Sequence, residues 1–182
     1  IHLGMGGSSL APEVLRQVLD FASGSLDLVV LDSTDPAQIK RTEREHTLAE
    51  TLFIVASKSG TTAETANLYT YFRARVAAEL GESAVSRHFC VITDPLTALE
   101  VLARDEGLPL FTNPPDIGGR FSALSLFGLL PAALIGADLE HLLFKAAGYA
   151  QACGEAEDTQ PNPGLQLGTL LGALAALDNP CD

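Results

Sequence analysis

The segment from Ser57 to Thr62 follows an apolar run and carries four hydroxyl groups, one ammonium group and one glycine. Residues 52–56 before it have the length and β-branched content of a buried strand, and a helix is predicted to begin near Thr61 or Thr62. The first four N–H groups of a helix lack partners within it, and the peptide dipoles place about half a positive charge there. Such a loop can donate several hydrogen bonds to a phosphate monoester, so we predict a phosphate site.

An alternative interpretation needs no ligand, because Thr61-x-x-Glu64 matches a capping box. Capping explains these two residues but leaves four other side chains of the loop without a role, namely Ser57, Lys58, Ser59 and Thr62. We therefore favour the phosphate site. Glu64 is the only carboxylate of this segment, and we assign it to capping Thr61 in preference to proton transfer.

A glycine-rich loop, Gly4-Met5-Gly6-Gly7-Ser8-Ser9, follows the end of an expected strand and precedes a helix with Pro12 in its first turn. The loop invites comparison with the dinucleotide fingerprint GxGxxG, and Asp32 lies where a ribose-binding acid would be. However, Ser9 replaces the third glycine, and its Cβ would crowd the helix against the strand. We favour a loop whose backbone approaches a sugar or phosphate while Ser8 adds a hydroxyl. Asp32 is then expected to be a turn residue, within Asp32-Ser33-Thr34-Asp35-Pro36, that caps the next helix.

A third loop, Asp116-Ile117-Gly118-Gly119-Arg120-Phe121-Ser122, comes after the last expected strand. Paired glycines give the backbone freedom beside Arg120, whose guanidinium can bond oxyanions in two places. Alternatively, Arg120 is a surface residue that bonds helix carbonyls while the glycines turn the chain. Because three glycine- or serine-rich loops follow strands, we favour a place for Arg120 in the site.

Other reactive side chains show no pattern typical of a site. No metal site is expected, because the four histidines lack metal-ligand spacing: His2, His46, His88 and His141. Ser57 and Cys90 lack a nucleophile elbow such as GxSxG, which gives covalent catalysis little support. The cysteines are odd in number and share no CxxC spacing, which favours a reducing compartment and hence the cytoplasm: Cys90, Cys153 and Cys181.

The chain has 182 residues, 47% of them hydrophobic, and a formal net charge of −12. This length and composition suit a globular domain. Nucleic acids and anionic membrane surfaces require clustered Lys and Arg, so the acidic balance argues against both as partners. No apolar run reaches the roughly 18–20 residues that cross a bilayer, so no membrane segment is expected.

Strands and helices alternate over the first two thirds of the chain. Strands are expected at residues 1–3, 27–31, 52–56, 88–92 and 108–111, and helices at about 10–21, 36–46, 61–80 and 96–106. This order predicts an α/β, doubly wound, five-stranded parallel sheet with helices on both faces. Extra helices are expected at 122–135, 138–153 and 165–177, with an exposed loop at 154–164. Ligands of such sheets bind at the carboxyl ends of the strands, near the point where strand order reverses.

Three segments together resemble the first sugar isomerase (SIS) domain of the glucose-6-phosphate isomerase family over nearly the whole chain. They are Gly4 to Leu10, Ser57 to Thr65 and Gly118 to Ser122. Ser-Lys-Ser-Gly-Thr-Thr followed about 60 residues later by Gly-Gly-Arg-Phe-Ser is a specific pair, whereas Ser-Gly-Thr-Thr alone is shared by many sugar phosphate binding domains. The segments Gly4 to Glu13 and Asp32 to Pro36 are most similar to the isomerase half of bifunctional transaldolase/glucose-6-phosphate isomerase enzymes.

The resemblance implies a flavodoxin-like domain that takes part in interconverting glucose 6-phosphate and fructose 6-phosphate through an enediol, without a metal or cofactor. The substrate phosphate would lie on Ser57, Lys58, Ser59, Thr61 and Thr62. Gly7, Ser8 and Gly119 would lie on the sugar side. Arg120, at the position of the family's active-site arginine, would stabilise negative charge on the enediolate.

The family's glutamate base, its ring-opening histidine and a late lysine all lie downstream of the Gly-Gly-Arg motif. We therefore expect residues 1–153 to form the sugar phosphate binding domain and 154–182 to form a loop and connector helix toward a second isomerase domain. The chain is then a fragment that binds hexose 6-phosphate weakly and does not turn it over alone, with the second domain and a homodimer as expected partners. The alternative is a non-catalytic sugar phosphate sensing domain.

Overall fold

A computed structural model of the chain describes residues 1–154 and 162–176, and the chain divides into two compact units, 1–137 and 138–182. The second unit contains α7 (Leu139–Gly154) and α8 (Pro163–Ala175), which Asn162 joins by donating to the Cys153 carbonyl at 2.7 Å. The domain boundary predicted at residue 153 stays a prediction. Residues 155–161 of the predicted loop, Leu177 and Cys181 lie outside the described residues.

The first unit contains the five-stranded parallel sheet that the sequence predicts. Its strands are β1 (His2–Gly4), β2 (Val30–Leu31), β3 (Phe53–Ala56), β4 (Phe89–Thr93) and β5 (Leu110–Thr112), in the order β2-β1-β3-β4-β5. This is the flavodoxin-like order, which reverses between β1 and β3. Gly4 pairs with Ala56 across that point, so the glycine-rich loop and the Ser57 loop leave the sheet side by side.

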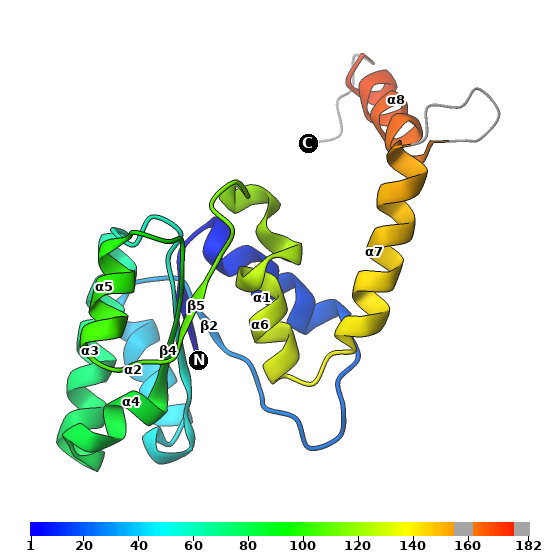
Figure 1. Cartoon of the computed structure of the whole chain (residues 1–182). Coiled ribbons are helices and arrows are strands. Elements are labelled where there is room, and N and C mark those ends of the chain that lie inside the picture. Colours follow the sequence, from blue (N-terminus) through cyan, green and yellow to red (C-terminus); the bar gives the residue numbers. More distant parts are fainter. Residues whose placement is uncertain (155–161, 177–182) are drawn as a thin grey trace. The chain divides into compact units, whose positions relative to one another are not determined.

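Helices cover both faces of the sheet (Figure 1). On one face lie α1 (Gly7–Val18) and α6 (Leu126–Leu134), and on the other lie α2 (Pro36–Glu45), α3 (Ala63–Leu80), α4 (Val85–His88) and α5 (Ala98–Asp105). Because both faces are covered, the strands are apolar at successive positions, as in Phe53, Ile54, Val55 and Ala56.

The two faces carry separate apolar cores. Phe53, Val55 and Phe89 face the α3 side together with Phe72, whereas Ile54 and Ile92 pack with Phe127 of α6. The ring centroids of Phe53 and Phe72 are 4.8 Å apart, a contact of a kind that contributes about 0.5–1.5 kcal/mol beyond its buried area. This packing fixes α3 on the sheet and so sets the position of its first turn beside the end of β3.

Several local predictions differ from the structure, among them the strand predicted at 27–31, which begins only at Val30. Helix α1 begins at Gly7, so Pro12 lies inside the helix and not in its first turn. The helix predicted at 122–135 is preceded by a 3₁₀ turn (Gly119–Leu124), and α6 starts only after Ser125, whose hydroxyl accepts from the Phe127 N–H at 3.4 Å. Asp35, not Asp32, caps α2, because its carboxylate accepts from the Ala37 N–H at 3.0 Å.

Within the described part of the chain, every helix is too short or too polar to cross a membrane.

Candidate functional site

Three loops at the carboxyl edge of the sheet are bonded to one another through their backbones. The N–H of Ser57 donates to the Ile92 carbonyl at 3.1 Å, the N–H of Asp94 to the Lys58 carbonyl at 3.3 Å and the N–H of Asn113 to the Thr93 carbonyl at 2.8 Å. These bonds continue the ladders of β3, β4 and β5 beyond the strands. The loops therefore form one connected rim.

The hydroxyls of the Ser57–Thr62 loop bond mainly to one another. Ser57 Oγ lies 3.0 Å from Thr62 Oγ1 and also accepts from the Gly60 N–H at 3.2 Å. Ser59 Oγ accepts from the Thr61 N–H at 3.3 Å and from the Thr61 hydroxyl at 3.1 Å. The loop is thereby curled so that its four hydroxyls are held in two pairs beside the start of α3.

The first turn of α3 has no side-chain cap among the described residues. The helix begins at Ala63, and its N-cap residue Thr62 makes no side-chain capping bond there. The prediction of a capping box at Thr61 and Glu64 is wrong, because the Thr61 hydroxyl bonds Ser59 and Thr62 occupies the N-cap position. The N–H groups of this turn and its share of the helix dipole remain available to an anion.

Gly60 is required by both its backbone and its surroundings. Its φ of +67° is a conformation that side chains with a Cβ rarely adopt. A Cβ at this position would also lie 2.6 Å from Cβ of Thr97, the residue that caps α5 through the Glu100 N–H. The loop is therefore packed directly against the start of α5.

Lys58 joins the three loops of the rim. Its ammonium donates to the carboxylate of Asp94 and to the Pro115 carbonyl at 3.0 Å. The Asp94 carboxylate, which is largely buried, also lies 3.4 Å from the amide nitrogen of Asn113. The charge of Lys58 is thus already paired, so the positive potential of the loop comes largely from the N–H groups and the dipole of α3.

The glycine-rich loop and the Arg120 loop touch each other. A Cβ on Gly7 would lie 2.7 Å from the carbonyl carbon and oxygen of Gly119, so only glycine permits this approach. The Ser122 hydroxyl lies 2.6 Å from the Gly119 carbonyl oxygen and 3.1 Å from that of Gly7. Ser8 follows Gly7 in the first turn of α1 and is largely buried.

Ser9 replaces the third glycine of a dinucleotide fingerprint, and its hydroxyl turns back to donate to the Gly6 carbonyl at 3.0 Å. The missing third glycine counts against a dinucleotide at this loop.

Arg120 is exposed within the 3₁₀ turn. Its guanidinium makes no hydrogen bond or ion pair with residues 1–154 or 162–176, so the interpretation in which it bonds helix carbonyls finds no support there. A cavity of about 220 Å³ beside it is lined by Gly7, Leu10 and Gly119, among others. As far as these residues are concerned, the guanidinium is free to meet an oxyanion.

The structure therefore brings the predicted site residues together in two groups. Ser57, Lys58, Ser59, Thr61 and Thr62 lie on one loop, and Gly7, Ser8, Gly119 and Arg120 lie on two loops in contact. Sequence reasoning missed Asp94, Asn113 and Ser122. Asp94 and Asn113 follow β4 and β5 directly, so their place at the carboxyl ends of strands was the available signal.

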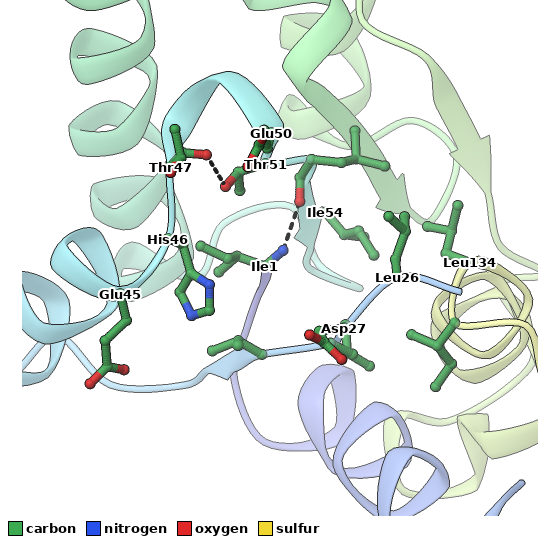
Figure 2. A pocket seen from close by; sticks show the side chains of 14 residues that line it. Ile1, Leu26, Asp27, Glu45, His46, Thr47, Glu50, Thr51, Ile54 and Leu134 are labelled. Carbon is green, nitrogen blue, oxygen red and sulfur yellow. Dashed lines mark hydrogen bonds between the residues drawn. The ribbon is translucent and has the colours of Figure 1, made fainter. Parts of the chain in front are cut away.

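A larger cavity lies at the opposite edge of the sheet (Figure 2). It has a volume of about 360 Å³ and is lined mainly by residues that precede β1, β2 and β3, among them Ile1, Asp27, His46 and Thr51. The amino group of Ile1 donates to the Leu52 carbonyl at 2.7 Å there. Because ligands of doubly wound sheets bind at the carboxyl ends of strands, we do not assign the substrate to this cavity.

Nucleophilic and metal chemistry find no support in the described residues. Burial raises the pKa of the Cys90 thiol to about 11, so this thiol is protonated at neutral pH. In the same part of the chain, no group of three or more His, Cys, Asp or Glu side chains is placed to hold a metal ion.

The sequence of this chain is similar to that of one protein family. A family model described as phosphoglucose isomerase matches residues 1–162. A glucose-6-phosphate isomerase from Thermus thermophilus is 43% identical over 147 residues, which cover 80% of this chain and 35% of that protein. A probable glucose-6-phosphate isomerase from Haloarcula marismortui is 37% identical over 174 residues, 96% of this chain and 38% of that protein.

Two solved structures are similar in fold and sequence. One is a hypothetical protein from Thermus thermophilus, with a TM-score of 0.85 and 38% identity over 94% of this chain and 40% of that one. The other is a glucose-6-phosphate isomerase from Chlamydia trachomatis, with a TM-score of 0.65 and 29% identity over 74% of this chain and 26% of that one. The chain spans little more than a third of the length of the curated relatives named above.

Proposed function

Since the chain belongs to the phosphoglucose isomerase family, we propose that it binds the 6-phosphate group of glucose 6-phosphate and fructose 6-phosphate. It would do so as part of an isomerase that interconverts these two sugars. The observation that carries the proposal is the start of α3, which no side chain of residues 1–154 or 162–176 caps and which the paired hydroxyls of the Ser57–Thr62 loop surround. Such a start can donate several charge-assisted hydrogen bonds to one dianion.

The phosphate displaces hydrogen bonds that the loop makes to itself. Ser57, Ser59, Thr61 and Thr62 exchange hydroxyl–hydroxyl bonds for bonds to phosphate oxygens, each worth about 1.5–3 kcal/mol to a charged partner. Lys58 contributes its N–H and, by holding Asp94 and Pro115, keeps the loop closed on the rim. The phosphate thus replaces solvent at a helix start without needing a free lysine.

The reacting end of the sugar lies toward Gly7, Ser8 and Gly119, with Arg120 beside it. When a proton moves between C1 and C2, negative charge develops on the enediolate oxygens, and an unpaired guanidinium aimed at them stabilises the transition state more than the ground state. The exposed, unpartnered state of Arg120 in the described residues supports this role.

The remaining groups of the reaction are proposed to come from elsewhere in the full-length protein. We propose that the full-length protein also supplies the catalytic base and a second isomerase domain, because this chain spans little more than a third of the length of its relatives. We further propose that it forms a homodimer and acts in the cytoplasm, in glycolysis and gluconeogenesis. The finer likeness to transaldolase fusions stays a prediction.

Calorimetric titration of the chain tests the proposal. Fructose 6-phosphate and glucose 6-phosphate should bind, inorganic phosphate should bind more weakly, and unphosphorylated fructose and NAD should give no heat of binding. Binding of NAD without binding of either hexose 6-phosphate would overturn the proposal. Binding of hexose 6-phosphate by a full-length protein that fails to isomerise it would instead support the sensing domain.

A further inference from the structure

Pro12 creates a local problem in α1. It lies inside the helix Gly7–Val18, where residue 12 would normally donate its N–H to the carbonyl of Ser8. Proline has no N–H, and its ring crowds the carbonyl four residues earlier. Pro12 and Ser8 are both buried, so water is a poor substitute. The Ser8 carbonyl therefore needs another donor.

His2 supplies that donor from the sheet. It lies on β1 and is fully buried, and its Nε2 is 2.7 Å from the Ser8 carbonyl oxygen. A carbonyl oxygen only accepts, so Nε2 carries the proton. Nδ1 has no hydrogen-bond partner among the described residues, in keeping with an unprotonated nitrogen and a neutral ring. Burial lowers the pKa of the imidazole to about 4, which agrees with this state.

Gly4 provides the space for this contact. A Cβ at Gly4 would lie 2.9 Å from His2 Nε2 and 3.2 Å from the Ser8 carbonyl oxygen. Any larger residue would force the ring and the carbonyl apart. Thus the first glycine of the glycine-rich loop admits the imidazole between β1 and the first turn of α1.

The same turn carries the predicted sugar-side residues. Gly7 and Ser8 lie between His2 on β1 and the Arg120 loop, where Ser122 donates to the Gly7 carbonyl and Gly119 contacts Gly7. A shift of this turn would move Ser8 and the surface against which Gly119 packs.

We infer that His2 is a positioning residue for the sugar-side loop: its Nε2–H supplies the Ser8 carbonyl with the hydrogen bond that Pro12 cannot donate, and so fixes the turn that carries Gly7 and Ser8. The stability half of this inference is independent of any ligand. The functional half rests on the proposed binding of hexose 6-phosphate.

A double-mutant cycle tests the pairing of His2 with Pro12. His2→Leu should lower the midpoint of thermal unfolding by about 3–6 °C in the parent chain. In a Pro12→Ala background, which restores the backbone N–H, His2→Leu should lower this midpoint by less than half as much. Equal losses in both backgrounds would overturn the inference. If His2→Leu does not fold, nitrogen NMR of the parent decides, since an Nδ1-protonated or doubly protonated His2 at pH 7 contradicts it.

Two ligands separate positioning from a general loss of structure. His2→Leu should raise the dissociation constant for fructose 6-phosphate about tenfold and leave that for inorganic phosphate unchanged, because the Ser57 loop does not depend on α1. Two variants should bind fructose 6-phosphate almost as tightly as the parent chain. One is His2→Gln, which retains an amide donor, and the other is the double variant of His2→Leu with Pro12→Ala. Equal weakening for both ligands would contradict positioning. If the parent chain binds neither ligand, the proposed function and the role of His2 in sugar binding are both wrong. The double-mutant cycle would still decide whether His2 compensates for Pro12.

Discussion

The backbone of Gly119 lies directly against Gly7, so close that a Cβ on Gly7 would be 2.7 Å from the Gly119 carbonyl carbon. The loops that follow β1 and β5 are therefore one structural unit, which Ser122 reinforces by its bond to the Gly7 carbonyl. Arg120, the residue next to Gly119, takes its position from this contact. The contact requires a glycine at position 7, whereas a Cβ on Gly119 would lie an ordinary 3.8 Å from the Gly7 Cα.

Gly7→Ala should displace the Arg120 loop. Overpacking at a tight contact costs about 1–3 kcal/mol, and here the contacting atoms are backbone and cannot rotate away. We expect a lower free energy of unfolding and weaker binding of fructose 6-phosphate, measured by denaturant titration and calorimetry. Gly148→Ala is the control, because a Cβ at Gly148 on α7 meets nothing within 4 Å in the described part of the chain. Parent-like stability of both variants would show that the contact is unimportant.

Lys58 and Asp94 should have opposite effects on phosphate binding. Lys58→Met leaves the Asp94 carboxylate uncompensated beside the anion, so binding of inorganic phosphate should weaken. Asp94→Asn frees the ammonium, so binding should tighten and become more sensitive to salt, while stability falls by about 1–3 kcal/mol. The readout is the dissociation constant at two salt concentrations. Weaker phosphate binding in both variants would mean that the pair acts only by holding the loop.

Arg120→Lys should reduce catalysis by the full-length isomerase without reducing stability. Lysine keeps the charge but loses the fork of donors, and loss of one donor to a developing oxyanion lowers kcat about 10²–10³-fold. KM should change little, because the phosphate holds the substrate. Arg104→Lys, at another exposed arginine, is the control in steady-state kinetics. A rise in KM with unchanged kcat would place Arg120 in ground-state binding instead.

His2 should make the chain less stable as the pH falls. Its pKa is lowered from 6.5 to about 4 by burial, so between these values the unfolded chain binds more protons than the folded chain. The contribution of His2 to stability is therefore complete above about pH 6.5 and falls by up to about 1.4 kcal/mol per pH unit toward pH 4. His2→Gln removes this contribution, so the stability difference between parent and variant should change with pH. A constant difference from pH 7 to pH 4.5 would show that His2 titrates normally.

The fold, and the gathering of the candidate site residues at one edge of the sheet, were predictable from local patterns. Strands such as β3 and β4 are short apolar runs that end at glycine or hydroxyl residues, and these signals need no knowledge of distant contacts. The parallel direction of the strands also followed from their alternation with helices. Ser57 and Thr62 were recognisable because they lie on one short loop between an apolar strand and a helix.

The remaining features depend on contacts between distant segments. The pairing of Lys58 with Asp94 and the contact of Gly7 with Gly119 arise only when the fold brings their loops together. The capping prediction at Thr61 was wrong because its hydroxyl bonds Ser59 instead, a choice set by the curl of the loop. The sequence also misplaces Pro12 in a first turn, because the glycines before it do not mark where α1 starts.

Thr62→Val tests the central claim most directly, since it keeps the side-chain shape and removes the hydroxyl that bonds Ser57 at 3.0 Å. The control is Thr70→Val on the helix α3, whose hydroxyl donates to the Ala66 carbonyl at 2.8 Å. Calorimetric titration with fructose 6-phosphate should give a dissociation constant at least about tenfold higher for Thr62→Val and a parent-like value for Thr70→Val. Equal affinity of parent and Thr62→Val, with both folded, would contradict a phosphate site at the start of α3.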